Sequence, residues 1–113
     1  MSVHHIREGD TFPNWRTQLF DADGDAIDLT GATVRLHVTE ERETRLVKID
    51  ALAVPDPDQV NNKGWVDYVF TPSDTGTPGR FWAEWEITFG TGEILTVPTR
   101  GHDTLIVHGQ LVA

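Results

Sequence analysis

Residues 81–89 alternate between two kinds of side chain. One side of the repeat carries Phe81, Ala83, Trp85, Ile87 and Phe89, and the other side carries Trp82, Glu84, Glu86 and Thr88. A period of two is typical of a long, half-buried β-strand with one face on a core and the other in water. Residues 90–92 then supply a glycine-rich turn before a second extended segment at 93–97, which predicts a β-hairpin.

Further extended segments recur along the chain, with turn residues between them. We expect them at residues 2–7, 13–20, 26–29, 32–39, 45–54, 65–70 and 103–111. No stretch longer than about ten residues has a helical period, and at most one short helical turn is expected, near residues 72–75. The pattern therefore predicts an all-β protein, a sandwich of about seven to nine strands. The strand register is least defined in residues 45–54.

The length of 113 residues suits one domain with one core, so a single β-sandwich domain is expected over residues 1–113. Residues 1–12 are expected to be either an extended N-terminal arm or a leading strand. The chain shows no apolar run of about 18 residues and no basic leader before an apolar block, so neither a membrane helix nor a secretory signal is expected. It has no cysteine, which excludes disulfides and thiolate chemistry.

The composition is acidic, with 18 carboxylates against nine lysines and arginines and a net charge of -9. A field of this sign opposes binding to a phosphate backbone or to anionic lipid, so neither nucleic acid nor a membrane is an expected partner. Two interpretations of the charge remain open: a solvated surface that prevents aggregation, or adaptation to high salt.

Several short motifs occur in a characteristic order. In the first half they are Gly9-Asp10-Thr11-x-Pro13, Leu19-Phe20-Asp21-Ala22-Asp23-Gly24 and Ile27-Asp28-Leu29-Thr30-Gly31-Ala32-Thr33-Val34. In the second half they are Gly64-x-Val66-x-Tyr68, Pro72-x-Asp74-Thr75 and Pro78-Gly79-x-Phe81-x-Ala83-x-Trp85. Over about residues 6–108 the chain resembles small proteins of tailed viruses that are related to the N-terminal, immunoglobulin-like domain of the phage baseplate upper protein.

This resemblance implies an immunoglobulin-like, antiparallel β-sandwich that is a component of the virion. It carries over no catalytic residues. The sequence stops after one domain, without the trimeric stalk region of a full baseplate upper protein, so the position in the particle stays open. The implied partners are other virion proteins and copies of the chain itself.

Residue clusters that could carry chemistry give no convincing site. Asp21, Asp23, Asp25 and Asp28 are acidic, but the sixth and twelfth positions of an EF-hand loop counted from Asp21 are both alanine. A looser calcium site between strands remains an alternative to an acidic turn. The five histidines are scattered or adjacent and lack metal-ligand spacing. We therefore expect no metal site and no cofactor.

Catalytic patterns are equally weak. Glu84 and Glu86 share one strand face, where no cleft is implied, and neither Ser2 nor Ser73 lies in a nucleophile elbow. The glycines at 90–92 form a hairpin turn rather than a phosphate loop. No enzyme activity is expected.

The aromatic residues give the candidate interface. If the apolar sides of their strands face inward, Trp65 and Trp82 face outward, unless loops fold over both rings. Phe12 and Trp15 lie in a segment that could dock as an arm on a neighbour. Exposed tryptophans anchor protein interfaces or stack on sugars. The expected function is therefore a non-catalytic structural role in the virion, and the alternative is a carbohydrate-binding module, with a host glycan as ligand.

Overall fold

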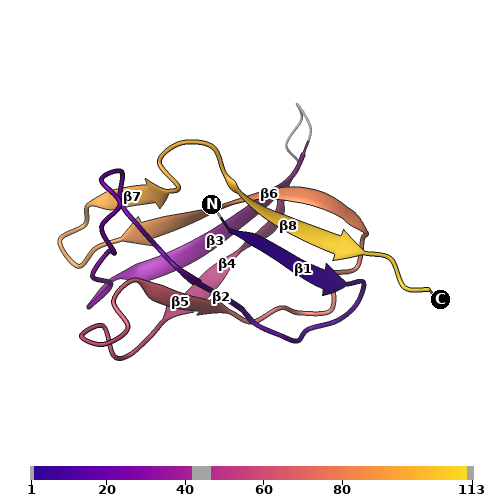
Figure 1. Ribbon diagram of the computed structural model, residues 1–113, viewed down its shortest axis with the longest axis horizontal. Helices are drawn as coiled ribbons and strands as arrows, with labels where there is room; N and C mark the ends of the chain where they lie inside the picture. The colour runs from indigo at the N-terminus through magenta and orange to yellow at the C-terminus, as the bar shows by residue number, and fades with distance from the viewer. Residues whose placement is uncertain (1, 42–46, 112–113) are drawn as a thin grey trace.

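The computed structural model describes residues 2–41 and 47–111 and consists of strands, turns and loops. Its eight strands are β1 (Val3–Arg7), β2 (Trp15–Gln18), β3 (Thr33–Glu40), β4 (Val47–Pro55), β5 (Trp65–Tyr68), β6 (Gly79–Thr88), β7 (Ile94–Val97) and β8 (Asp103–His108) (Figure 1). Residues 72–75 form hydrogen-bonded turns, and the described part of the chain contains no helix that could span a membrane. The all-β prediction is confirmed.

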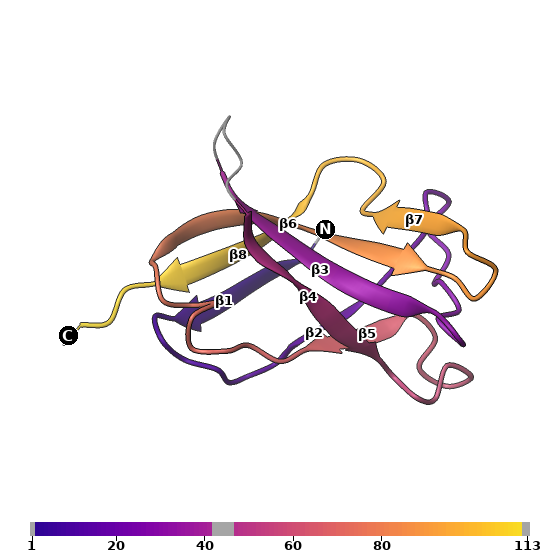
Figure 2. The ribbon, with the colours of Figure 1, turned by 180° about the vertical axis from the view of Figure 1, so that it is seen from behind.

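The strands pair in the order β1-β8-β6-β3-β4-β5-β2, and β7 pairs with the second half of β6. The strand β4 joins the two layers of the sandwich. Most of β4 pairs with β3 in the larger layer, and its last residues, Val54 and Pro55, pair with β5 in the smaller one (Figure 2). All of these pairs are antiparallel except β1 with β8, which is parallel. This order matches an immunoglobulin-type sandwich, with β2 and β6 on opposite sheets.

The alternation seen in the sequence places the core between the layers. Phe81, Ala83, Trp85 and Ile87 of β6 point inward and are at most 4% exposed. The rings of Trp85 and of Trp15 from β2 meet in a T-shaped contact across the sandwich, with ring centroids 5.2 Å apart and planes at 78°. In immunoglobulin domains a disulfide often joins two strands across the sheets. In this cysteine-free chain, a tryptophan pair fills the corresponding space between β2 and β6.

A buried carboxylate completes this centre. Trp85 Nε1 donates to Asp103 Oδ2 at 2.9 Å, and the backbone N–H of Ser2 donates to Asp103 Oδ1 at 2.8 Å. Asp103 is only 6% exposed. Because both of its oxygens are engaged, one side chain ties the centre of β6 and the N-terminal strand to β8.

Several expected segments differ from the observed strands. Residues 2–7 contain the leading strand β1, while residues 26–29 contribute only an isolated bridge between Ala26 and Phe20. Residues 45–46 of the expected segment 45–54 lie outside the described residues. Its first described residue, Val47, falls on the same side of the period-two repeat as the buried Ile49 but is 69% exposed, because the β3–β4 register shifts between Val38 and Thr39.

Candidate functional site

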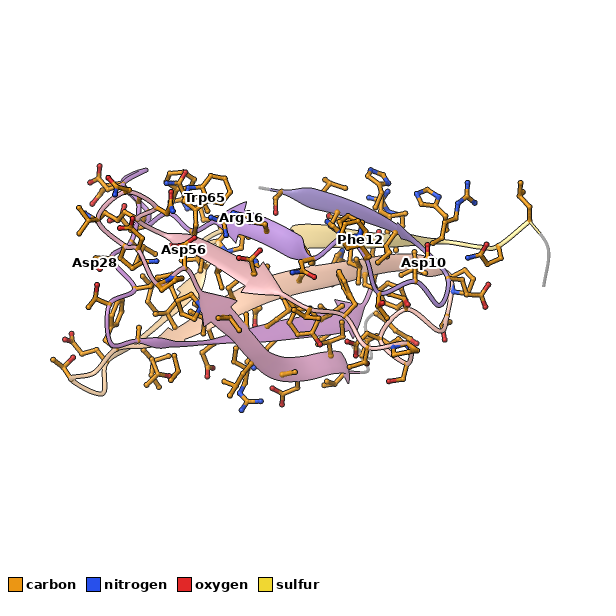
Figure 3. All side chains as sticks on the ribbon, turned by 90° about the horizontal axis from the view of Figure 1, so that it is seen from below. Asp10, Phe12, Arg16, Asp28, Asp56 and Trp65 are labelled. Carbon is orange, nitrogen blue, oxygen red and sulfur yellow. The ribbon has the colours of Figure 1, made fainter. Side chains whose placement is uncertain are left out.

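One candidate site is a cluster around Trp65, at the start of β5. The guanidinium of Arg16 on β2 lies 5.1 Å from the centroid of the Trp65 ring. Arg16 also donates to Asp56 at 2.7 Å and to Asp67 at 2.5 Å. Figure 3 shows Arg16, Asp56 and Trp65 gathered at the same end of the molecule. Arg16 therefore covers one face of the tryptophan and is itself held by two carboxylates.

The electrostatics of this cluster are mutually stabilising. The hydrogen bond from Arg16 lowers the pKa of Asp56, and the backbone N–H of Asp58 adds to this shift. In return, the hydrogen bond to Asp56 raises the pKa of Arg16. These charges are therefore paired with each other, and the cluster orients Trp65 rather than offering a reactive group.

A groove of about 780 Å³ opens beside Trp65. It runs between the residues of β2 and its C-terminal extension on one side and the connection from β7 to β8 on the other. Its lining residues are Ser2, residues 17–22, Trp65, residues 97–100 and Asp103. β2 pairs with β5 alone among the described strands, so this groove borders a sheet edge.

The second candidate site surrounds Trp82, on the outer face of β6. The ring of Trp82 stacks on His102, with centroids 5.0 Å apart and planes at 30°. Together with His37 and Glu84, these rings border a hollow of about 320 Å³. His37 lies between two carboxylates, with Nε2 3.3 Å from Asp50 Oδ1 and Nδ1 3.8 Å from Glu84 Oε1. An aromatic ring beside polar groups is an arrangement that suits a sugar or a polar peptide.

Both Trp65 and Trp82 lie on outer sheet faces, as the alternation predicts, and both are partly buried. The alternative was that loops cover both rings. A loop residue, His102, stacks on Trp82, whereas the residue over Trp65 is Arg16, which belongs to a strand. Phe12 is 81% exposed in the connection between β1 and β2, apart from the Trp65 cluster (Figure 3). The interface roles of Trp65, Trp82 and Phe12 stay predictions.

Trp15 is a correction. It was named as a candidate interface residue in a segment that could dock as an arm, but it is 2% exposed and lies in the core against Trp85, which agrees with the strand expected over residues 13–20. The reason is that β2 begins at Trp15, which pairs in register with Tyr68 and points inward with Thr17. Its side chain cannot contact a neighbour in this fold.

Two carboxylates of the acidic segment 21–28 accept local hydrogen bonds. Asp21 Oδ1 accepts from the backbone N–H groups of Asp23 and Asp25, and Asp28 Oδ1 accepts from the backbone and hydroxyl of Thr30. Within residues 2–41 and 47–111, no three His, Asp or Glu side chains are grouped so that they could hold a metal ion. These contacts fit the acidic-turn interpretation of the segment.

Sequence reasoning missed an apolar strip on β4. Leu52 and Val54 are each 60% exposed on the outer face of the strand, and Val47 at its start is 69% exposed. The sequence contained a sign of this exposure. Leu52 and Val54 are even-numbered, like Lys48 and Asp50, so a period-two strand places all four on the same, outward face.

Comparison with known proteins supports the fold and nothing finer. No protein-family model matches the chain, and no curated protein matches it. Among solved structures, it is similar to "The crystal structure of CopC from Methylosinus trichosporium OB3b", with a TM-score of 0.53 and 9% sequence identity. The match covers 97% of this chain and 87% of that one. At this identity the likeness shows a shared β-sandwich architecture.

Proposed function

We propose that this chain is a non-catalytic structural module of a tailed-virus particle that acts through protein–protein contacts. The observation that carries the proposal is the apolar strip of β4, formed by Leu52 and Val54, which Asp50 separates from the exposed Val47 on the outer face of the strand. Apolar side chains grouped on a sheet face mark a surface that a partner covers. The ordered motifs of the sequence support the virion as the place of that partner.

The net charge of the chain limits which partner surfaces the β4 strip can contact. At -9, two copies repel each other at long range, so the β4 strip favours a neutral or basic partner surface or a contact made at high ionic strength. The expected partners are other virion proteins and further copies held within the particle. Localisation in the virion follows from the same proposal.

The test is a double substitution in the strip, Leu52→Asp with Val54→Asp, in the gene of an assembling virus. Both side chains are exposed, so the variant should fold, while buried charge in the contact should exclude it from purified particles. Val60→Asp is the matched control, because Val60 is 92% exposed in a loop away from the sheet face. Normal incorporation of the double variant, or absence of the protein from particles altogether, would contradict the proposal.

A carbohydrate-binding role is the second candidate, and the hollow beside Trp82 favours it. Trp82 is the better platform, because Arg16 already covers one face of Trp65 and is fixed there by two carboxylates. Titration of a glycan panel against intrinsic tryptophan fluorescence should find a ligand that Trp82→Ala loses and Trp65→Ala keeps. If no glycan in a broad panel binds the unmodified protein, this candidate is excluded.

A further inference from the structure

The N-terminal strand β1 lies at the edge of the larger sheet, and a histidine on each of its two faces contacts neighbouring rings. Among the described strands it pairs with β8 alone (Figure 1). On the inner face, the ring of His4 stacks between Trp15 and Phe70, with centroids 5.5 and 5.4 Å away. On the outer face, His5 Nδ1 lies 2.9 Å from His108 Nε2 of β8.

The inner histidine favours the docked strand only while it is neutral. Burial lowers the pKa of His4 by more than its bond to the backbone of Pro13 raises it, and the nearby His5 lowers it further. Its Nε2 is buried without a hydrogen-bond partner. A detached β1 exposes this ring to water, where it takes up a proton below about pH 6.5. Mild acid therefore favours detachment.

The outer pair is a second side-chain contact between β1 and β8. A bond between two imidazole nitrogens needs one N–H and one lone pair. The charged groups near the histidines of β1 do not offset the cost of protonating His4. Arg7 follows on β1, and Arg80 of β6 lies opposite Ile106, which is itself opposite His5. Among the described residues, no carboxylate forms an ion pair with His4, His5 or His108.

We propose that β1 is an exchangeable strand: mild acid releases it, and the freed edge of β8 then accepts β1 from a second copy of this chain. The vacated slot fits that occupant, because it is shaped by the His4 and Ile6 side chains of the same sequence. The link at residues 8–14 can span about 24 Å when extended, which lets β1 reach a neighbour. Exchange between identical strands needs no new contact chemistry.

Two further observations favour a second copy as the occupant. Phe12 is 81% exposed within the link, and two links that cross between copies can cover each other's Phe12. Uptake of a proton by His4 also reduces the magnitude of the net charge of -9, which weakens repulsion between copies. The inference rests on the proposed function only in taking the domain to act through protein contacts.

The absence of cysteine makes a clean cross-linking test available. Val3 and Thr104 are register partners on β1 and β8, so Val3→Cys with Thr104→Cys reports which β8 each β1 pairs with. The reduced variant is incubated at pH 5 or pH 7.5 at high concentration, returned to pH 7.5 and then oxidised. We expect a covalent monomer after pH 7.5 and a several-fold increase in covalent dimer after pH 5. Light scattering on the unmodified chain should show the same acid-dependent dimer.

The histidines are tested by adding His4→Phe and His5→Gln to the cysteine pair, because these side chains can fill similar space without titrating. This variant should stay monomeric after pH 5, whereas His37→Gln, a histidine on the sheet face away from β1, should still exchange. Covalent monomer alone after pH 5 overturns the proposal, as does equal dimer at both pH values. This test needs no virus. Strand exchange can therefore fail while the β4 strip still directs assembly, and the virion role can fail while strand exchange is observed.

Discussion

At the scale of single residues, the pair of Trp15 and Trp85 joins the two layers inside the core. Trp15→Ala removes a side chain that is 2% exposed and leaves a cavity beside Trp85. We expect the free energy of unfolding to fall by about 3–5 kcal/mol, measured by urea denaturation. Trp82→Ala is the control for loss of a tryptophan from the outer face, with an expected cost of about 1 kcal/mol. Equal losses of unfolding free energy in the two variants would contradict the central role of the Trp15–Trp85 contact.

His4 gives a residue-scale prediction for pH. Its pKa lies below 6.5 in the folded protein, mainly because the ring is buried, so the unfolded chain binds the extra proton first. Stability is therefore fully present above about pH 6.5 and declines as the pH falls from 6.5 toward the folded-state pKa. His4→Phe should remove this decline. Unfolding free energies at pH 7.5 and pH 5.5 test it, with a difference well under the limit of about 1.4 kcal/mol per pH unit, since the ring is partly exposed.

At the scale of elements, the loop that joins β4 to β5 depends on one buried glutamine. Gln59 is 8% exposed, and its Oε1 accepts from the backbone N–H groups of Leu29 and Gly64 at 3.0 and 2.9 Å. Its Nε2 donates to the carbonyl of Asp56. Gly64 has a φ of 84°, and a Cβ there would lie 2.8 Å from the carbonyl oxygen of Leu19, so no other residue suits the position.

Gln59→Leu should therefore destabilise the fold, because it leaves two backbone donors without an acceptor. We expect a loss of about 1–3 kcal/mol for each donor that stays buried, measured by thermal or urea unfolding. Gln18→Leu is the matched control, since Gln18 also bonds a backbone carbonyl, that of Lys63, but at an exposed site. If both substitutions cost the same, Gln59 does not organise the loop.

These elements show what the sequence could and could not predict. The strand at β6 was predictable because its alternation is a local pattern with a period of two. The inward position of His4 beside Ile6 follows the same rule, yet a histidine in a short segment gives no sign that two aromatic rings will enclose it. Proline, asparagine and glycine marked the loop after β4, but nothing in that composition placed Gln59 inside.

At the scale of the whole molecule, the two-layer architecture and the outward faces of Trp65 and Trp82 were predictable, whereas the residues that cover or extend these surfaces were not. The exposure of Val47 depends on the shifted register between β3 and β4, and the cover on Trp65 depends on Arg16 from a strand distant in sequence. Both are set by which strands become neighbours. Trp15 illustrates the same limit, because its segment was compatible with a strand or a docking arm, and the pairing of β2 with β5 decides between them.

The net charge yields a prediction for the molecule as a whole. At about 10 mM salt the Debye length is about 30 Å, and the molecule measures 45 × 30 × 22 Å, so nearly all charges interact. With a net charge of -9, that interaction is repulsive on balance and opposes the folded state. Raising NaCl to about 300 mM should increase the melting temperature by roughly 4 °C, or about 1 kcal/mol, in differential scanning calorimetry. Sucrose at equal osmolality is the control for non-ionic effects. A melting temperature that falls with salt would mean that local ion pairs such as Arg16 with Asp56 outweigh the repulsion.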